Sequence, residues 1–157
     1  MKKKYSLVGF SGTFAPLHIG HKHLLKKAFQ VSNKVMIGIT DDGMTKRKEC
    51  AELIAPFSER KEKIINFLKE EGYFERTIFI KLTDAYGPAI EDSGLEALIL
   101  SEETSYMGKK INEIRMERNL KPLDFVTVKL FLAKDGKRIS STRIRKKEID
   151  PDGNILG

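Results

Sequence analysis

Hydrophobic and polar positions alternate in blocks along the 157-residue chain. Short apolar runs have the composition of buried strands, and they cover residues 5–10, 34–40, 77–82, 95–100 and 125–133. Between these runs, apolar residues recur at helical spacing. The spacing predicts helices over residues 19–29, 59–71 and 107–118, and a last helix that begins within 139–145.

This alternation predicts parallel strands, because strands joined by a helix are usually neighbours in one sheet. The sequence has no internal repeat, low-complexity linker or domain boundary. We predict an α/β fold: a single domain over residues 1–157, doubly wound and Rossmann-like, with a mostly parallel sheet of about five strands. Ser58 is expected to be the N-cap of the second helix, and residues 84–89 to form a loop.

Composition narrows the class of ligand. The chain is 40% apolar and 32% charged, with a net charge of +7, and its basic residues are spread along the sequence. This spread favours a phosphate-rich small molecule over nucleic acid. The basic start at residues 2–4 precedes an apolar run that stops at Gly9, which predicts a first strand rather than a signal peptide. No stretch is long enough to span a membrane, and Cys50 is the single cysteine, so we expect a cytoplasmic protein.

The turn between the first predicted strand and the first predicted helix is the main candidate site. It has the sequence G-T-F-A-P-L-H-I-G-H over residues 12–21. Unpaired N–H groups at a helix start attract anions, and His18 and His21 lie one turn apart on the same side. Gly20 removes a side chain where a flat ligand could lie against the backbone. The alternative is a tight turn whose histidines are buried and satisfied.

A zinc site is a second alternative for the histidines. Catalytic zinc usually needs three protein ligands, and His23, two positions after His21, faces away on a helix. No cysteine or carboxylate lies at a fitting spacing. We therefore expect no resident metal.

A second anion-binding segment is predicted at I-S-S-T-R-I-R, residues 139–145. Residues 140–142 offer hydroxyl and N–H groups at a helix start, and Arg143 or Arg145 adds a guanidinium fork for phosphate oxygens. Taken alone, the segment could be an ordinary Ser/Thr cap before a solvated basic helix. Both candidate segments follow strands, however, and should share the sheet edge where ligands of open α/β sheets bind.

These residues resemble a known family. G-T-F-x-P-L-H-I-G-H-K with a late I-S-S-T-R-I-R looks like the nucleotidylyltransferase superfamily, which carries an H-x-G-H signature. The closer resemblance is to archaeal and eukaryotic-type phosphopantetheine adenylyltransferases, enzymes of coenzyme A biosynthesis. It includes further pieces in the same order: P-F-S-E-R-K (56–61), D-A-Y-G-P-A (84–89), L-E-A-L-I-L-S-E-E-T (95–104) and I-N-E-I-R-M-E-R-N-L-K-P-L (111–123).

The resemblance implies transfer of AMP from ATP to 4′-phosphopantetheine, giving dephospho-coenzyme A and pyrophosphate, with Mg²⁺ accompanying the ATP. Dephospho-coenzyme A or coenzyme A would bind as product or inhibitor. His18 and His21 would stabilise charge that develops at the α-phosphorus. Lys46 or Lys48, in a cationic loop or short helix over residues 44–49, would bridge the two phosphates.

Further contacts follow from the same resemblance. Thr13, Phe14 and Lys46 would lie beside the acceptor, and Gly20 would pack near the adenine. ATP contacts are implied at Gly12, Thr13, Phe14, His18, Gly20, His21, Arg115, Ser140, Ser141, Thr142 and Arg145.

Two positions differ from the pattern of the family. Ala15 stands where the family usually has Asp, and Ser11 where it often has Gly. A carboxylate at position 15 could orient a neighbouring group or shape the acceptor pocket. Two alternatives therefore stay open: another superfamily member, such as a nicotinamide mononucleotide adenylyltransferase or a cytidylyltransferase, or a nucleotide-binding or nucleic-acid-binding module that has lost catalysis.

Overall fold

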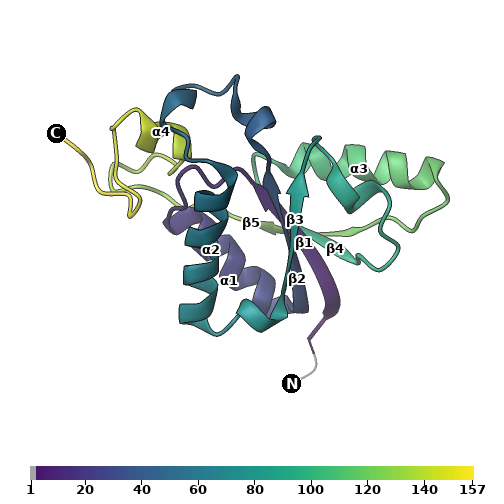
Figure 1. Cartoon of the computed structure of the whole chain (residues 1–157). Coiled ribbons are helices and arrows are strands. Elements are labelled where there is room, and N and C mark those ends of the chain that lie inside the picture. Colours follow the sequence, from purple (N-terminus) through teal and green to yellow (C-terminus); the bar gives the residue numbers. More distant parts are fainter. Residues whose placement is uncertain (1–2) are drawn as a thin grey trace.

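The computed structural model describes residues 3–157, which contain one five-stranded sheet (Figure 1). All neighbouring strands run parallel, in the order β3-β2-β1-β4-β5. The predicted doubly wound, Rossmann-like α/β fold is confirmed. The strands are β1 (Tyr5–Gly12), β2 (Ser32–Thr40), β3 (Thr77–Leu82), β4 (Ala97–Ser101) and β5 (Asp124–Val128). The helices are α1 (Ile19–Val31), α2 (Phe57–Glu71), α3 (Ser105–Glu117) and α4 (Ser141–Arg145).

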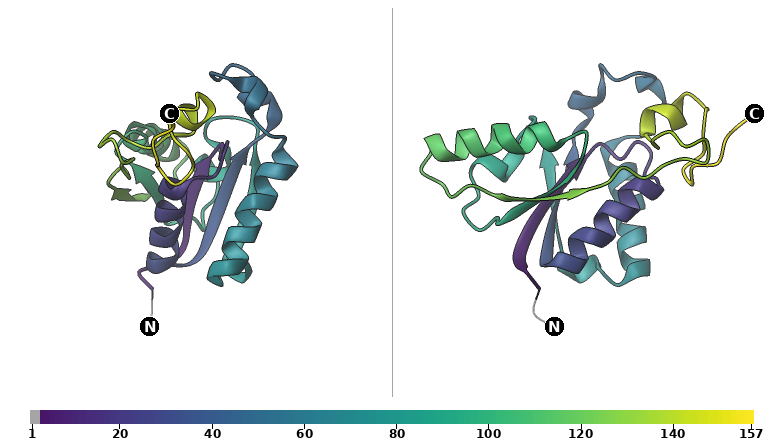
Figure 2. Two further views of the ribbon diagram at one scale, coloured as in Figure 1. Left: turned by 90° about the vertical axis from the view of Figure 1, so that its left-hand side faces the viewer. Right: turned by 180° about the vertical axis from the view of Figure 1, so that it is seen from behind.

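Helices cover both faces of the sheet, as strands that are apolar on both sides require. α1 and α2 lie on one face and α3 lies on the other (Figures 1 and 2). None of the helices in residues 3–157 has the length and apolar character that a membrane crossing needs. The core under α1 and α2 includes Val8, Phe10, Val35, Ile37, Ile39, Ala97 and Ile99, and the core under α3 includes Leu98, Leu100 and Ile111.

The second helix begins two residues earlier than predicted, because its cap comes from a distant residue. α2 starts at Phe57, with Pro56 at the N-cap position. The backbone N of Phe57 donates to the Asp42 carboxylate at 2.8 Å. The prediction that Ser58 caps this helix is therefore wrong. Gly72, with φ of 78°, ends the helix.

The last predicted strand is too long. β5 ends at Val128, and residues 129–133 leave the sheet. This segment turns back on the chain that follows it, with an antiparallel bridge between Leu132 and Arg138. A separate small core holds it in place, formed by Ala133, Ile139 and Ile149 with Phe131 packed against them.

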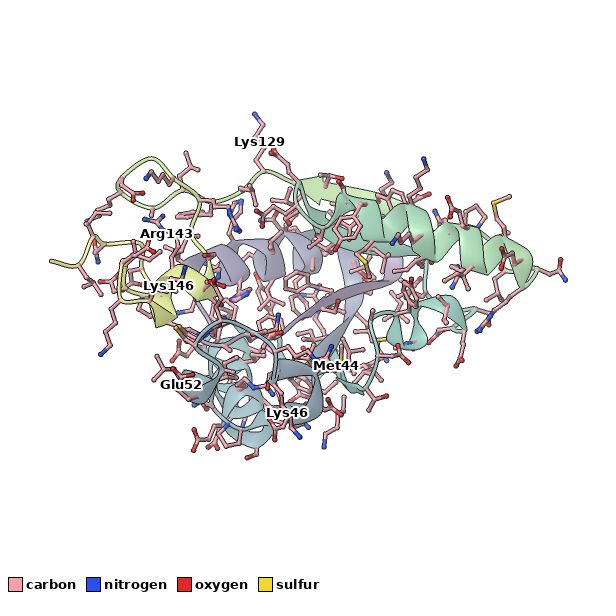
Figure 3. All side chains as sticks on the ribbon, turned by 90° about the horizontal axis from the view of Figure 1, so that it is seen from above. Met44, Lys46, Glu52, Lys129, Arg143 and Lys146 are labelled. Atoms are coloured by element: carbon pink, nitrogen blue, oxygen red, sulfur yellow. The ribbon has the colours of Figure 1, made fainter. Side chains whose placement is uncertain are left out.

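The carboxyl ends of the parallel strands meet at one edge of the sheet, where the connecting loops gather (Figure 1). Figure 3 looks down on this edge, with α3 on one side and α4 on the other. In open α/β sheets this is the edge where ligands bind.

Candidate active site

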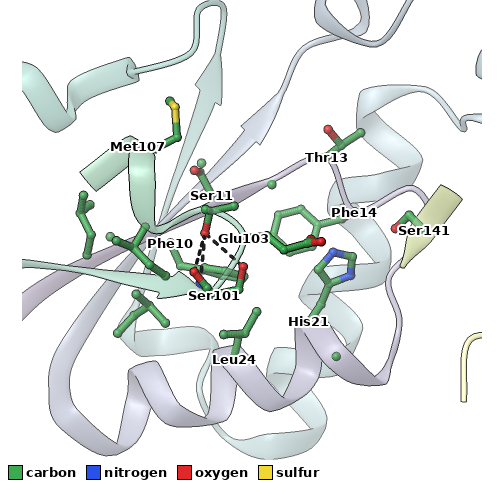
Figure 4. A pocket seen from close by; sticks show the side chains of 18 of the residues that line it. Phe10, Ser11, Thr13, Phe14, His21, Leu24, Ser101, Glu103, Met107 and Ser141 are labelled. Carbon is green, nitrogen blue, oxygen red and sulfur yellow. Dashed lines mark hydrogen bonds between the residues drawn. The ribbon is translucent and has the colours of Figure 1, made fainter. Parts of the chain in front are cut away.

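A cavity of about 430 Å³ opens at the carboxyl edge of the sheet. Figure 4 shows Met107 and Ser141 toward opposite ends of it, with Phe14 and His21 between them. The structure thus brings the two predicted anion-binding segments to one cavity. The predicted site residues that line it are Gly12, Thr13, Phe14, His18, Gly20, His21, Lys48, Ser140, Ser141, Thr142 and Arg145.

His18 and His21 cap the start of α1 reciprocally. His18 Nδ1 accepts from the backbone N of Gly20 at 3.1 Å and from that of His21 at 3.3 Å. His21 Nδ1 accepts from the backbone N of His18 at 3.2 Å. The rings stack with their centroids 3.7 Å apart and 19° between their planes. Each ring is therefore fixed through Nδ1.

The second nitrogen of each ring is left for a ligand. Within residues 3–157, every fully buried side-chain nitrogen or oxygen has a hydrogen-bond partner. The two Nε2 atoms have no partner in that part of the chain. They are therefore not fully buried, and they are accessible from the cavity. Burial lowers the pKa of His18 to about 4. Burial, with a smaller effect from His18, also holds the pKa of His21 well below its ordinary value. Because Nδ1 accepts, the proton of each neutral ring is on Nε2. The pair presents two N–H donors side by side.

Gly20 makes room for the imidazole of His18 and also lines the cavity. A Cβ at this position would lie 2.9 Å from Cε1 of His18 and 3.0 Å from Cγ2 of Ile139. His18 and Ile139 thus fill the space on the Cβ side of Gly20, and contact of a ligand with the backbone of Gly20 stays a prediction. A side chain at position 20 would displace the imidazole that caps α1.

His23 stands apart from the histidine pair. It is exposed on α1, and its ring lies 5.6 Å from the ring of Phe131. Within residues 3–157 no group of three or more His, Cys, Asp or Glu side chains is placed to hold a metal ion.

The residues before α1 hold the turn in a fixed shape. Phe14 has φ of 55° and is buried. Its ring lies edge-on to Phe10, with centroids 5.8 Å apart, and 4.8 Å from the His21 ring. Thr13 Oγ1 accepts from Thr40 Oγ1 at 3.0 Å, at the end of β2. The Phe14 ring thus packs against the ring of His21, which lines the cavity.

Helix α4 is joined to the histidine turn by hydrogen bonds. Ser141 Oγ donates to the carbonyl of Pro16 at 3.0 Å. The Arg145 guanidinium donates to the carbonyl of Ala15 at 2.6 Å and to that of Glu49 at 3.0 Å. The two predicted anion-binding segments are therefore fixed relative to each other.

The guanidinium groups of this segment already have partners inside the protein, so the structure does not support the predicted fork for phosphate oxygens. Arg145 is committed to carbonyl oxygens, and Arg143 pairs with Asp135 and Glu148 outside the cavity. Ser140 is the N-cap of α4, and its Oγ accepts from the backbone N of Arg143 at 3.2 Å. The groups that this segment presents to the cavity are the hydroxyls of Ser140, Ser141 and Thr142.

Two other predicted contacts lie outside the cavity. Arg115 on α3 is 1% exposed, and its guanidinium donates to three backbone carbonyls at 2.7, 2.8 and 3.0 Å. It fixes loops on the α3 side and is no longer a candidate nucleotide contact.

Lys48 lines the cavity and Lys46 does not. Figure 3 shows Lys46 on the outer part of its loop. Of the two lysines, the structure favours Lys48.

Arg60 on α2 is buried beside the site, and the sequence alone did not indicate a role for it. It is 2% exposed. Its guanidinium donates to the carbonyls of Ala55 at 2.8 Å and Thr13 at 2.9 Å, and to the Asp42 carboxylate at 3.0 Å. Arg60 therefore ties the histidine turn to the loop between β2 and α2. The available signal was its position four residues before Ile64, on the buried stripe of the helix.

Ala15 faces away from the main cavity. Its side chain is buried and lines a smaller cavity of about 250 Å³ behind the turn. The departure from the family's Asp therefore affects the back of the turn and not the wall of the main cavity. The charged residues around the smaller cavity are all cationic: Arg60, Lys63, Arg145 and Lys147.

The variant Ala15→Asp is expected to be more stable to heat than Ala15→Asn, which has the same shape without the charge. The carboxylate would lie among cations, with no acid in the lining of the smaller cavity, and salt would screen the attraction. A gain of about 1 kcal/mol raises the melting temperature of a domain of this size by about 2–4 °C. Circular dichroism melts at low and high salt measure the difference. Equal melting temperatures at both would contradict the expectation.

Comparison with known proteins identifies the class. A family model described as cytidylyltransferase-like matches residues 10–147, and the chain belongs to that family. A crystal structure of a protein with unknown function from Archaeoglobus fulgidus is similar, with 31% identity, coverage of 78% of this chain and 88% of that chain, and a TM-score of 0.70. A bifunctional NMN adenylyltransferase/ADP ribose pyrophosphatase from Francisella tularensis shares the fold, at 19% identity and a TM-score of 0.65 over 91% of this chain and 42% of that chain.

Curated relatives identify the particular family. A phosphopantetheine adenylyltransferase from Thermococcus gammatolerans is 45% identical over 156 residues, which cover 99% of this chain and 98% of that protein. The chain belongs to the phosphopantetheine adenylyltransferase family, and the resemblance drawn from the motifs is confirmed.

Proposed function

We propose that this protein transfers the adenylyl group of ATP to 4′-phosphopantetheine, giving dephospho-coenzyme A and pyrophosphate, a step of coenzyme A biosynthesis. The single observation that supports this best is the 45% identity to a phosphopantetheine adenylyltransferase over nearly the whole of both chains. The site agrees with it, because two neutral histidines, Lys48 and the hydroxyl groups of residues 140–142 line one cavity.

The chemistry needs no general base. A phosphate oxygen of the acceptor is already anionic, and it attacks the α-phosphorus of ATP in line with the bond to the bridging oxygen. That bond breaks and pyrophosphate leaves. The main obstacle is repulsion between two anions, so catalysis consists of positioning and of stabilising spread negative charge. Among the described residues that line the cavity, Glu103 is the one carboxylate, and it is paired with a cation.

Roles can be assigned to the groups that line the cavity. The Nε2–H groups of His18 and His21 would donate to oxygens of the α-phosphate, where charge develops in the transition state. Lys48 would bridge the reacting phosphates. The hydroxyls of residues 140–142 would hold the β- and γ-phosphates, and Thr13 would lie beside the acceptor phosphate.

The other end of the cavity suits the pantetheine arm. A flexible chain of methylene and amide groups can bury against an apolar wall. A nicotinamide nucleotide would bring a charged ring and a ribose, which need polar partners. Figure 4 shows Met107 at this end, and the other apolar residues that line the cavity include Met36, Leu82, Leu95 and Leu98.

Mg²⁺ is proposed to arrive with ATP as part of the substrate. Mg²⁺ keeps several waters and binds through substrate phosphates together with one or two carboxylates. The described lining of the cavity contains a single carboxylate, that of Glu103. The residues present therefore fit MgATP and offer no protein cage for a resident ion.

The proposal extends to partners and location. Dephospho-coenzyme A, and coenzyme A, which contains it, would occupy the same cavity as product or inhibitor. These partners are small molecules, and neither nucleic acid nor a membrane is needed. Cys50 is a free thiol, which supports a reducing cytoplasmic location.

Pyrophosphate release from ATP is expected only when 4′-phosphopantetheine is present. A coupled pyrophosphate assay on the purified protein measures this, with nicotinamide mononucleotide in place of the acceptor and CTP in place of ATP as controls. Faster release with either control would assign the chain to another branch of the superfamily. ATP binding without release for any acceptor would indicate a module that has lost catalysis.

A further inference from the structure

An ion pair joins two walls of the main cavity. Glu103, on the loop between β4 and α3, accepts from the Arg138 guanidinium at 2.6 Å. Both residues line the cavity, and their side chains are 43% and 46% exposed. Among the described lining residues, Glu103 is the one acid. It stands in a site that must receive polyanions.

The backbone of Arg138 is held firmly, close to the hydroxyl segment. Arg138 lies two residues before Ser140 and forms the antiparallel bridge with Leu132. Its carbonyl accepts from the Arg143 guanidinium at 2.8 Å, and Arg143 is itself paired with Asp135. These backbone contacts fix where the Arg138 side chain begins, and the ion pair with Glu103 fixes the direction in which it points.

The Arg138 guanidinium has N–H donors that are not used in the ion pair with Glu103. Within residues 3–157, Glu103 is the one acceptor that its side chain meets, through a single nitrogen. A half-exposed ion pair of this kind is worth at most about 1 kcal/mol. A phosphate group offers the planar fork of a guanidinium two oxygens at once and a higher charge. A triphosphate would therefore compete successfully with Glu103 for Arg138.

We propose that Arg138 is a phosphate ligand for ATP, and that Glu103 holds it in the free protein and is exchanged for the nucleotide when ATP binds. The inference rests on the proposed function, because it needs ATP as the substrate, but it concerns residues to which the motifs assigned no role. The exchange makes Glu103 a determinant of nucleotide affinity: it competes with the triphosphate for one guanidinium, and it recaptures that guanidinium when the nucleotide leaves.

The test is ATP binding to the full-length protein without acceptor, measured by titration calorimetry. Arg138→Gln is expected to weaken ATP binding by about 10- to 100-fold, the loss that a hydrogen bond to a charged group produces. Glu103→Gln is expected to tighten it by up to about five-fold, as release of an exposed ion pair allows. Arg138→Lys, which keeps the charge and loses the fork, should fall between wild type and Arg138→Gln.

Neighbouring residues supply matched controls. Lys137→Gln and Glu102→Gln make the same charge changes one position away, at exposed residues that do not line the cavity. Both variants are expected to bind ATP with an affinity within two-fold of wild type. A two-fold change is about 0.4 kcal/mol, which is within the usual effect of a surface substitution. Melting temperatures of all variants check that each protein is folded.

The double variant Glu103→Gln/Arg138→Gln separates exchange from general repulsion. If Glu103 acts through Arg138, the double variant binds ATP as weakly as Arg138→Gln alone. If Glu103 merely repels the nucleotide, its removal still tightens binding in the double variant, and the exchange is refuted. ATP affinity of Arg138→Gln equal to that of Lys137→Gln would refute the role of Arg138.

The outcomes also separate this inference from the proposed function. Binding of ATP alone is measured, so the order of the variants tests Arg138 and Glu103 whichever acceptor the protein uses. Failure of 4′-phosphopantetheine to release pyrophosphate from ATP would refute the proposed acceptor. A wild-type protein that does not bind ATP would overturn both.

Discussion

Replacement of His21 by alanine is expected to lower the rate of adenylyl transfer by about 10²- to 10³-fold, the usual loss when one preorganised donor to a developing charge is removed. His21 lines the cavity beside His18, and their rings stack with centroids 3.7 Å apart, so the two Nε2–H groups are fixed close together. Pyrophosphate release at saturating ATP and acceptor measures the loss.

A second substitution separates the chemistry from the cap of α1. His21 Nδ1 accepts from the backbone N of His18, so alanine also removes a capping bond worth about 1 kcal/mol. Asparagine places an oxygen near the position of Nδ1 and has no group at Nε2. His21→Asn should therefore keep the melting temperature and lose the rate. His23→Ala, on the exposed side of the same helix, is the control. Near-normal turnover of His21→Asn would refute the assigned role.

Replacement of Arg60 by methionine is expected to destabilise the protein and to slow the reaction further than the loss of stability explains. The substitution removes charged hydrogen bonds to two carbonyls, of Thr13 and Ala55. At about 1.5–3 kcal/mol for each such bond, the free energy of unfolding should fall by about 3 kcal/mol or more. Urea unfolding measures this loss.

The effect of Arg60 on the rate comes from position. Without it, the turn that carries the histidines and the loop that carries Lys48 lose their shared anchor. Misplacement by about 1 Å can cost about 100-fold in rate. Activity is assayed at a temperature where the variant is fully folded. Lys69→Met, at an exposed position of the same helix, should leave both quantities unchanged, and Arg60→Lys should restore part of each. Full activity of folded Arg60→Met would contradict the positioning role.

The sequence predicts most of the fold because hydrophobic spacing follows local geometry. The strands and helices recur close to their predicted ranges, and the parallel order places both anion-binding segments at one edge. Two of the boundaries that differ from the prediction have non-local causes. α2 begins where its first backbone N–H donates to the Asp42 carboxylate, and β5 ends at Val128, before the segment in which Leu132 bridges to Arg138. Neither partner lies within the segment whose boundary it sets.

The arginines show why the site was harder to predict than the fold. Arg60 and Arg115 both lie on buried sides of helices, and both donate to backbone carbonyls. They differ in which loops their helices adjoin, which is a property of the tertiary structure. Gly20 illustrates the same limit, because the space that it leaves is filled by His18 and by the distant Ile139.

The buried arginines have a consequence for how far related sequences can diverge. Arg60, Arg115 and Arg145 hold the loops through carbonyl oxygens, which every amino acid provides. A loop held through its backbone carbonyls can accept different side chains while its backbone path stays the same. Position 15 is an example: alanine offers Arg145 the same carbonyl that an aspartate would. A substitution within such a loop therefore keeps the hydrogen bonds to the arginine, provided that the backbone path is unchanged.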